Sequence, residues 1–538
     1  MNLQEKINQH LEKIYTAEDL LEAKQLFVSL LTKSKVHKNA AKPSEETAYL
    51  ITYGDSFRDK DRAPLSVLRE VVAEKLPDFT DIHILPMFPY TSDDGFSVVD
   101  YLAINPELGT WQDVENLAQE RHLMFDFVCN HLSKSSDWFQ QFLSDADEFK
   151  SAFISFDENF DSSKTTRPRT SPLFTEIDGK KVWTTFSADQ VDTNAHDPKM
   201  LARLTEVLLE YVARGASSIR LDAIGFLWKQ SGTTSMHLPQ THEVIKLWRT
   251  LLDALAPNVQ IITETNVPHA DNISYFGNGT DEANMVYQFP LPPLVLHSFI
   301  SGNSSALTHW AKTIKPVSDS ATYFNFLASH DGIGLRPTEG ILTDEERERI
   351  AQQVLDNGGK VSYKNNPDGS QSPYELNINY LSALGSAEKL LAAHAILLSF
   401  LGVPAIYYHS IFGSRNDLKA VQETGIARRI NREKLDKTRL YAELESNLER
   451  KQIYEKLSQL LKFRKNEVAF NPYGNQKILD FGERVFALKR EYGKKTLLSI
   501  INISDEIVTL SFSGLDIITQ TVFSGTLNPY QYVWISLD

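Results

Sequence analysis

The stretch SSIRLDAIGF, residues 217–226, reads as a buried β-strand that ends in two opposite charges. Arg220 and Asp222 stand two positions apart, and alternate residues of a strand point to the same face of a sheet. Charged side chains are almost never fully buried unless they are paired. The stretch therefore predicts a strand of the core with a polar site at its end.

Seven further apolar runs of the same kind are spread along the chain. Continuous apolar strands separated by helix-like stretches are typical of a parallel sheet that is buried on both faces. Eight such strands predict an α/β protein with a closed (β/α)8 TIM barrel rather than an open doubly wound sheet. The other seven runs are AYLITYG (48–54), DIHILPMF (81–88), HLMFDFV (122–128), VQIITE (259–264), MVYQF (285–289), YFNFLAS (323–329) and VPAIYYH (403–409).

The remaining segments predict parts outside the barrel. Apolar residues at helical spacing indicate a helical lead-in, and two long intervals that leave strand ends read as loop domains over the face where barrels build active sites. Short alternating segments near the end predict an antiparallel β domain. The predicted order is a helical N-terminal extension (1–46), barrel (47–131), loop domain (132–200), barrel (201–331), loop domain (332–388), barrel (389–471) and C-terminal β domain (472–538).

Composition and charge narrow the class of protein. The chain has 538 residues, and its 55 Lys and Arg residues face 70 Asp and Glu residues, which gives a net charge of -15. This balance argues against nucleic acid or an anionic membrane as a partner. The amphipathic start lacks the apolar core of a signal peptide, and no run approaches the ~20 apolar residues of a membrane span. With Cys129 as its one cysteine, the chain cannot form an internal disulfide, so we expect a cytoplasmic protein.

Several predicted strands end in polar or ionisable side chains. Any one of them could be a helix cap or part of a surface salt bridge. In a barrel, however, strand ends on one face meet in one pocket, so carboxylates from different strands would lie together and need nearby cations. The strand-end residues are Asp126, Asn130, His131, Arg220, Asp222, Glu264, His330 and Asp331.

Three of these acids suit glycosyl transfer with retention of configuration. Asp222, beside the cation Arg220, is the candidate nucleophile. Glu264 ends an apolar run that would raise its pKa, as a proton donor requires. Asp331 could grip ring hydroxyls of a distorted sugar. Retention would place the carboxyl groups of Asp222 and Glu264 about 5 to 5.5 Å apart.

Four short motifs, DFVCNH, IRLDAIGF, ITETN and FLASHDG, resemble the conserved regions of the α-amylase superfamily, glycoside hydrolase family 13. From about residue 48 to 538 the chain is similar to the sucrose phosphorylase subfamily, in segments such as HILPMFPYTSDDGFSVVDY, MVYQFPLPPL, SPYELNINY and GSRNDLKAV. The helical lead-in, ITETNVPHADNISYFG, NFLASHDGIGL and NNPDGSQSPYELN most resemble its glucosylglycerate phosphorylase branch.

The resemblance implies a role for each matching residue. Asp222 matches the nucleophile, Glu264 the acid/base and Asp331 the stabilising aspartate. Tyr374 and Glu375 fall in a mobile loop that reshapes the acceptor site for phosphate. The residues that match sugar contacts in the donor site are Asp93, Phe96, His131, Gln190, Arg220, His330 and Arg428.

Other interpretations stay open at some of these positions. Asp93 or Asp94 could cap the turn before FSVVDY, and Phe96 could be core packing. Arg428 lies in the charged run ARRINREK, which could be a solvated helix face. One of the arginines of that run, Arg428, Arg429 or Arg432, is expected to enter the pocket.

Metals and nucleotide cofactors find no support in the sequence. Asn130 and His131 fall where many α-amylases bind calcium, but there is no acidic loop of EF-hand type and no His/Cys cluster at zinc spacing. No Walker A loop or Rossmann glycine fingerprint occupies a strand-to-helix turn. We therefore expect no metal site and no cofactor, with inorganic phosphate as a co-substrate.

The resemblance implies a retaining phosphorylase that converts glucosylglycerate and phosphate into α-glucose 1-phosphate and D-glycerate. Siblings that act on sucrose, sucrose 6-phosphate or glucosylglycerol are the alternatives, and a non-catalytic amylase-like binding subunit is a remote one. Glycerate and phosphate are both anions, so we expect local cations, with Arg336, Lys364 and the ARRINR arginines as candidates. The expected partners are these small molecules, and the protein is expected to be a monomer or a homodimer.

Overall fold

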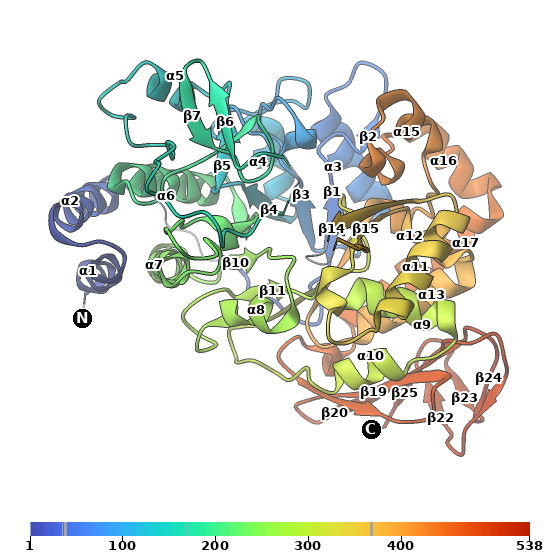
Figure 1. The fold of residues 1–538 in the computed structure, drawn as a ribbon. Helices are drawn as coiled ribbons and strands as arrows, with labels where there is room; N and C mark the ends of the chain where they lie inside the picture. The colour runs from blue at the N-terminus through green and yellow to red at the C-terminus, as the bar shows by residue number, and fades with distance from the viewer. Residues whose placement is uncertain (1, 35, 37–39, 169–170, 366–368, 538) are drawn as a thin grey trace. The chain divides into compact units, whose positions relative to one another are not determined.

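Eight parallel strands form a closed barrel in the computed structural model of this chain, which describes residues 2–34, 36, 40–168, 171–365 and 369–537. The order around the barrel is β1-β16-β12-β11-β10-β9-β4-β3, and Figure 1 labels β1, β3, β4, β10 and β11 among these strands. The strands are β1 (Tyr49–Thr52), β3 (Asp81–Ile84), β4 (His122–Phe127), β9 (Ala216–Leu221), β10 (Gln260–Thr263), β11 (Met285–Tyr287), β12 (Thr322–Asn325) and β16 (Val403–Tyr407). Each coincides with one of the predicted apolar runs, so the predicted TIM barrel is confirmed.

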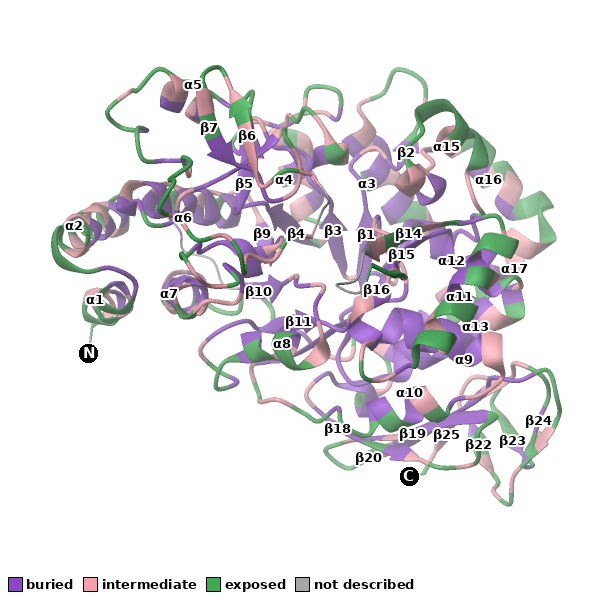
Figure 2. Cartoon of the chain, viewed as in Figure 1, coloured by how far each residue is buried: buried purple, intermediate pink, exposed green. Residues whose placement is uncertain are grey.

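Burial explains why these strands read as continuous apolar runs. Seven of the eight are buried at every residue and β4 at every residue except His122, as the purple strands of Figure 2 illustrate. A strand that is covered on both faces has no solvent side on which to place polar residues. The polar exceptions within or at the end of these strands are therefore informative.

The chain divides into two units, which we describe separately. The first comprises residues 1–42, 83–265 and 274–286, and the second comprises residues 43–82, 266–273 and 287–538. The helices of the first unit are α1 (Leu3–Ile14), α2 (Ala17–Lys33), α4 (Trp111–Ala118), α5 (Asp137–Leu143), α6 (Pro198–Ala213) and α7 (Pro239–Leu255).

The predicted helical lead-in is the pair α1 and α2. α1 packs on α7 and α2 packs on α6, and the buried side chains of the pair recur at helical spacing. His10 fixes this packing, since its ring nitrogens lie 2.6 Å from Glu243 Oε1 and 2.8 Å from Thr250 Oγ1. The lead-in is thus an integral part of the first unit.

The first inserted segment carries two small antiparallel ladders. One pairs β5 (His131–Ser133) with β8 (Gln190–Asp192), and the other pairs β6 (Phe174–Ile177) with β7 (Lys180–Trp183). In the first ladder His131 is opposite Asp192 and Ser133 is opposite Gln190. Residues far apart in the sequence are thereby brought to one place beside the end of β4.

The second unit contains the other α-helices of the described residues. They are α3 (Pro64–Lys75), α8 (His269–Ile273), α9 (Leu291–Ser301), α10 (Ser305–Ala311), α11 (Asp344–Asp356), α12 (Tyr380–Leu384), α13 (Ala387–Ser399), α14 (Tyr408–Ile411), α15 (Leu418–Thr424), α16 (Lys437–Ser446) and α17 (Leu448–Lys465). The second inserted segment holds α11 and an antiparallel sheet of β13 (Ile333–Gly334), β15 (Gln371–Asn377) and β14 (Lys360–Asn365). A short parallel ladder joins β2 (Phe57–Arg58) and β17 (Leu435–Asp436).

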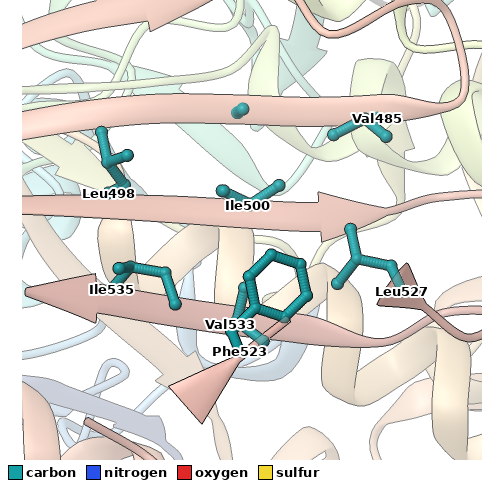
Figure 3. Close-up of a cluster of buried hydrophobic side chains, with 8 residues drawn as sticks. Val485, Leu498, Ile500, Phe523, Leu527, Val533 and Ile535 are labelled. Carbon is teal, nitrogen blue, oxygen red and sulfur yellow. The ribbon is translucent and has the colours of Figure 1, made fainter. Parts of the chain in front are cut away.

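The C-terminal part is an antiparallel sheet in the order β18-β19-β20-β25-β22-β23, as predicted. Alternate apolar side chains of its strands, for example Val485, Ile500 and Val533, form a buried cluster on one face (Figure 3). The intervening side chains Phe486, Ile501 and Trp534 are buried as well. The strands are β18 (Asn475–Leu479), β19 (Val485–Tyr492), β20 (Lys495–Asn502), β22 (Gly514–Asp516), β23 (Thr521–Phe523) and β25 (Tyr532–Ser536), beside a ladder of β21 (Val508–Thr509) and β24 (Thr526–Leu527).

Two buried arginines, one in a helix and one in this sheet, hold main-chain segments of the second unit together. Arg464 of α17 donates to the carbonyl oxygens of Leu398 (3.1 Å) and Thr47 (3.0 Å). Arg490 of β19 donates to those of Ser399 (3.0 Å) and Asn471 (2.7 Å). Burial lowers the pKa of both guanidinium groups to about 9, so both are charged at neutral pH.

Candidate active site

The guanidinium group of Arg220 organises the acids of the first unit. Arg220 is the fifth residue of β9, and its Nη1 donates to a carboxylate oxygen of Asp126 and to Asp222 Oδ1, the latter over 2.8 Å. Its Nη2 lies 3.8 Å from Glu264 Oε2. The candidate nucleophile and the candidate acid/base therefore face one buried cation, as the charges at the end of the strand predicted.

The main chain fixes these two acids as well. Asp222 N donates to Phe127 O over 3.2 Å, and Glu264 N donates to Leu221 O over 3.1 Å. Ala223 adopts a left-handed conformation with φ 48°, and its N–H donates to Glu264 Oε2 over 3.1 Å. These contacts hold Asp222 and Glu264 close together at neighbouring strand ends, and such positioning of reacting groups favours catalysis.

Asp126, one of the predicted strand-end residues, pairs with His83, which was not among them. Asp126 is opposite Arg220 in the register of β4 and β9, and His83 Nε2 lies 2.7 Å from Asp126 Oδ2. Burial raises the pKa of Asp126, but the charges and hydrogen bonds of Arg220 and His83 lower it more, so the carboxylate stays ionised. The sequence signal for this pair is His83, because it interrupts the apolar run DIHILPMF, whose one other polar residue is Asp81.

Four predicted donor-site residues of the first unit contact one another. Gln190 Nε2 lies 3.3 Å from Asp93 Oδ2, 3.3 Å from His131 Nε2 and 3.2 Å from Phe96 O. His131 Nε2 is also 3.1 Å from Phe96 O. The Phe96 ring lies 5.7 Å from the Arg220 guanidinium carbon, which is a cation–π contact. This contact connects the group of four to the arginine that the acids share.

The electrostatics of this group favour a neutral His131. Burial lowers the pKa of its imidazole, and the charges of Asp192 and Asp93 offset this only in part. A neutral ring has one N–H donor and one acceptor nitrogen, which suits a hydrogen bond with a sugar hydroxyl. Phe96 is 6% exposed, so its ring is mostly packed within the protein.

A buried lysine lies beside Asn130, where the sequence raised the question of a metal ion. Lys229 Nζ is 2.6 Å from Asp192 Oδ2 and donates to Asn130 Oδ1 over 2.7 Å, and Asn130 Nδ2 donates to Asp192 Oδ2. Burial lowers the pKa of Lys229, and Asp192 opposes that effect. In the described residues no group of three or more His, Cys, Asp and Glu side chains could hold a metal ion.

In the second unit, Asp331 and Glu375 share the cation Arg428. Arg428 Nη1 lies 2.7 Å from Asp331 Oδ1, while its Nε and Nη2 donate to the two oxygens of Glu375 over 3.0 and 2.7 Å. His330 Nε2 is 3.4 Å from Asp331 Oδ2. Of the ARRINR arginines, Arg428 therefore pairs at short distance with the predicted stabilising aspartate, and its side chain is 18% exposed. Arg432 Nη2 also lies 4.0 Å from Asp331 Oδ1.

The structure also places the other candidate residues of this region. Tyr374 and Glu375 lie within β15, which pairs with both β13 and β14. Arg432 donates from Nε to His330 O over 2.8 Å. Of the candidate anion-binding cations, Lys364 pairs with Glu339 over 2.5 Å and Arg336 begins a short 3-10 helix.

Comparison with known proteins identifies the family. The family model described as alpha amylase, catalytic domain, matches residues 52–351. Of the helices in the described residues, none combines the length and the apolar character needed to cross a bilayer.

Two curated relatives are similar over most of their length. The chain is 47% identical to the glucosylglycerate phosphorylase of Allomeiothermus silvanus, over 91% of either chain. It is 42% identical to that of Escherichia coli, over 99% of this chain and all of the other. Among solved structures, the sucrose 6F-phosphate phosphorylase from Thermoanaerobacter thermosaccharolyticum superposes with a TM-score of 0.76 at 26% identity, over 86% of this chain and 95% of the other.

Proposed function

This chain belongs to the α-amylase family, and on that premise we propose that it is a retaining α-glucosyl phosphorylase. Its reaction converts glucosylglycerate and phosphate into α-D-glucose 1-phosphate and D-glycerate. The observation that carries the choice of substrate is identity of 42–47% to two glucosylglycerate phosphorylases, against 26% to a sucrose 6F-phosphate phosphorylase.

The first step transfers the glucosyl group to the protein. A carboxylate oxygen of Asp222 attacks the anomeric carbon while Glu264 gives its proton to the glycosidic oxygen, and glycerate leaves. Arg220 supports this step because its Nη1 donates a hydrogen bond to Asp222 Oδ1 and so orients the carboxylate. Asp331 is assigned to hydroxyl groups of the glucosyl ring.

The second step transfers the glucosyl group to phosphate. A phosphate oxygen attacks the same carbon from the face that glycerate left, Glu264 takes up the proton that the phosphate loses, and the bond to Asp222 breaks. Two inversions restore the α configuration. We assign Asp93, Phe96, His131, Gln190, His330 and Arg428 to the glucosyl group, and Tyr374 and Glu375 to the acceptor.

No metal or cofactor enters these steps, and phosphate is a co-substrate. The substrates and products are small molecules. We propose a cytoplasmic location, where inorganic phosphate is available, and a monomer or homodimer as the working unit.

An acceptor panel tests the reaction and the substrate together. The purified protein receives α-glucose 1-phosphate with D-glycerate, glycerol, D-fructose or fructose 6-phosphate, and released phosphate is measured. We expect D-glycerate to give the fastest release. Faster release with another acceptor would identify a sibling phosphorylase, and no release with any acceptor would contradict the proposal.

A hydrolysis assay complements the panel. Glucosylglycerate is incubated with and without phosphate, and glucose and glucose 1-phosphate are quantified. We expect glucose 1-phosphate to dominate when phosphate is present. Undiminished glucose formation without phosphate, and no glucose 1-phosphate with it, would indicate a hydrolase instead.

A further inference from the structure

The turn that carries Asp93 has an unusual backbone. Asp93, Asp94 and Gly95 are consecutive residues with positive φ, at 54°, 49° and 113°. Residues other than glycine adopt this left-handed conformation rarely and keep it only where the surroundings fix it. At Gly95 a β-carbon would lie 2.9 Å from Pro86 O, so the turn is also pressed against the end of the β3 segment.

One carboxylate holds both ends of this turn. Asp189 Oδ2 accepts hydrogen bonds from Thr91 Oγ1 and Ser97 Oγ, each over 2.6 Å, and from the hydroxyl of Ser92. Its Oδ1 accepts from Ser133 Oγ over 3.2 Å. Thr91 and Ser92 precede the left-handed residues and Ser97 follows them, so the Asp189 carboxylate bridges the two ends of the turn.

The same turn presents the donor-site residues. The Gln190 amide donates to Asp93 Oδ2 and to the carbonyl oxygen of Phe96, and that carbonyl oxygen also lies within hydrogen-bond distance of His131 Nε2. Gln190 is the residue next to Asp189. The two neighbours therefore contact the turn at different points. Asp189 binds the residues at the two ends of the turn, and Gln190 contacts Asp93 and Phe96 between them.

We propose that Asp189 is a positioning residue for the glucosyl half of the active site. It acts through the turn 91–97 on Asp93 and Phe96, and the inference rests on the proposed function of these residues as the donor site. Ionisation is essential, because a carboxylate accepts several hydrogen bonds and donates none.

The charge state of Asp189 agrees with this role. Burial raises the pKa of its carboxyl, but the hydroxyl groups of Ser92, Ser97, Thr91 and Ser133 lower it more. The carboxylate is therefore ionised at neutral pH. Its main-chain oxygen also accepts from Lys134 N over 2.8 Å, which fixes the residue itself.

The test compares Asp189→Asn with a matched control, Asp178→Asn. Asp178 lies in the exposed turn between β6 and β7 of the same inserted segment. The asparagine amide nitrogen cannot accept, and its neutral oxygen is a weaker acceptor than a carboxylate oxygen, so the shared acceptor of three hydroxyls is weakened and its charge is lost. We expect the Kd for D-glucose, measured by calorimetry, to rise about 10-fold, since small displacements of positioning groups cost on the order of 10- to 100-fold. The control should bind glucose as the wild type does.

Kinetics give a second readout. For Asp189→Asn, kcat/KM should fall by the same factor with glucosylglycerate and with glucose 1-phosphate, because both present the same glucosyl group, and the KM for each should rise. A merely structural role would lower kcat through loss of active protein and leave KM and glucose binding unchanged. That result would overturn the proposal.

Two further variants guard against misfolding. Ser97→Ala removes one donor and should give a smaller effect in the same direction, while Asp189→Glu should restore part of the binding. Wild-type glucose affinity in Asp189→Asn or in a folded Ser97→Ala would refute the inference. If the wild type binds glucose but makes no glucose 1-phosphate, the proposed function fails, while weakened glucose binding in Asp189→Asn still supports the positioning role.

Discussion

Arg428 and Glu375 form a two-pronged ion pair, in which Nε and Nη2 donate to the two carboxylate oxygens over 3.0 and 2.7 Å. The third nitrogen, Nη1, lies 2.7 Å from Asp331. One guanidinium group thus links the aspartate that follows β12 to strand β15. Bidentate pairs of this kind fix geometry more than single contacts do.

This link makes Gly332 a sensitive position. A β-carbon at Gly332 would lie 2.5 Å from Glu375 Cγ and 2.8 Å from Leu376 O. We expect Gly332→Ala to push Glu375 away from Arg428 and to lower kcat/KM for phosphorolysis about 10-fold or more. Steady-state assays measure this. Glu375→Gln removes the charge without the clash, so a much smaller loss for Gly332→Ala than for Glu375→Gln would argue against this explanation.

The nucleophile assignment predicts a large kinetic effect. Asp222→Asn keeps the shape of the side chain but removes the attacking oxygen's charge, so kcat should fall on the order of 10⁴-fold or more. Glucose 1-phosphate formation measures it, and circular dichroism checks the fold. Asp145→Asn, at a surface residue that pairs with Lys180, is the control and should keep full activity. Substantial turnover by Asp222→Asn would refute the assignment.

Buried His394 predicts a pH dependence of stability. Burial lowers the pKa of its ring to about 4, while an unfolded histidine titrates near about 6.5. The unfolded chain therefore binds more protons between these values, and this contribution to stability, complete above about pH 6.5, is lost as pH falls. From pH 7 to pH 5 the free energy of unfolding should drop by about 2 kcal/mol through this group.

Urea denaturation at the two pH values measures that drop. His394→Met cannot take up the proton, so its stability should change less between pH 7 and pH 5 than that of the wild type. His309→Gln replaces an exposed histidine of α10 and should leave the difference as it is. Equal pH slopes for His394→Met and the wild type would contradict the prediction.

The helical lead-in predicts a contrast between two leucines. Leu11 of α1 is 0% exposed, whereas Leu21 of α2 is 61% exposed. Leu11→Ala should lower the free energy of unfolding by about 3 kcal/mol, because truncation leaves a cavity. Leu21→Ala should change it by less than about 0.5 kcal/mol. If Leu11→Ala costs no more than Leu21→Ala in chemical denaturation, α1 is not packed as described.

The barrel could be predicted because its signal is local. Each strand, such as Val403–Tyr407, is a continuous apolar run that burial on both faces explains. The polar residues at strand ends also stood out, since Arg220 and Asp222 contradict their apolar surroundings. Features that depend on neighbours in the sequence, such as an apolar strand or a charge that interrupts it, can therefore be predicted.

Partners from distant segments could not be predicted. Nothing in the sequence couples Asp189 to Ser97, or Lys229 to Asp192, because these contacts depend on how the first inserted segment folds back. Strand β15 was missed because its residues QSPYELN are mostly polar and its pairing with β14 is non-local. The roles of the individual site residues therefore remain predictions that the experiments above can decide.

The carbonyl contacts of Arg464 and Arg490 have a consequence for sequence change. Every residue type supplies a main-chain oxygen, so the neighbours of these two arginines can be substituted freely without removing an acceptor. For the same reason, no substitution at a neighbour can compensate for the loss of either arginine. In a mutational library, positions 464 and 490 should not tolerate substitution, whatever residues occupy the neighbouring positions. Arg428 has side-chain partners, so position 428 should covary with positions 331 and 375.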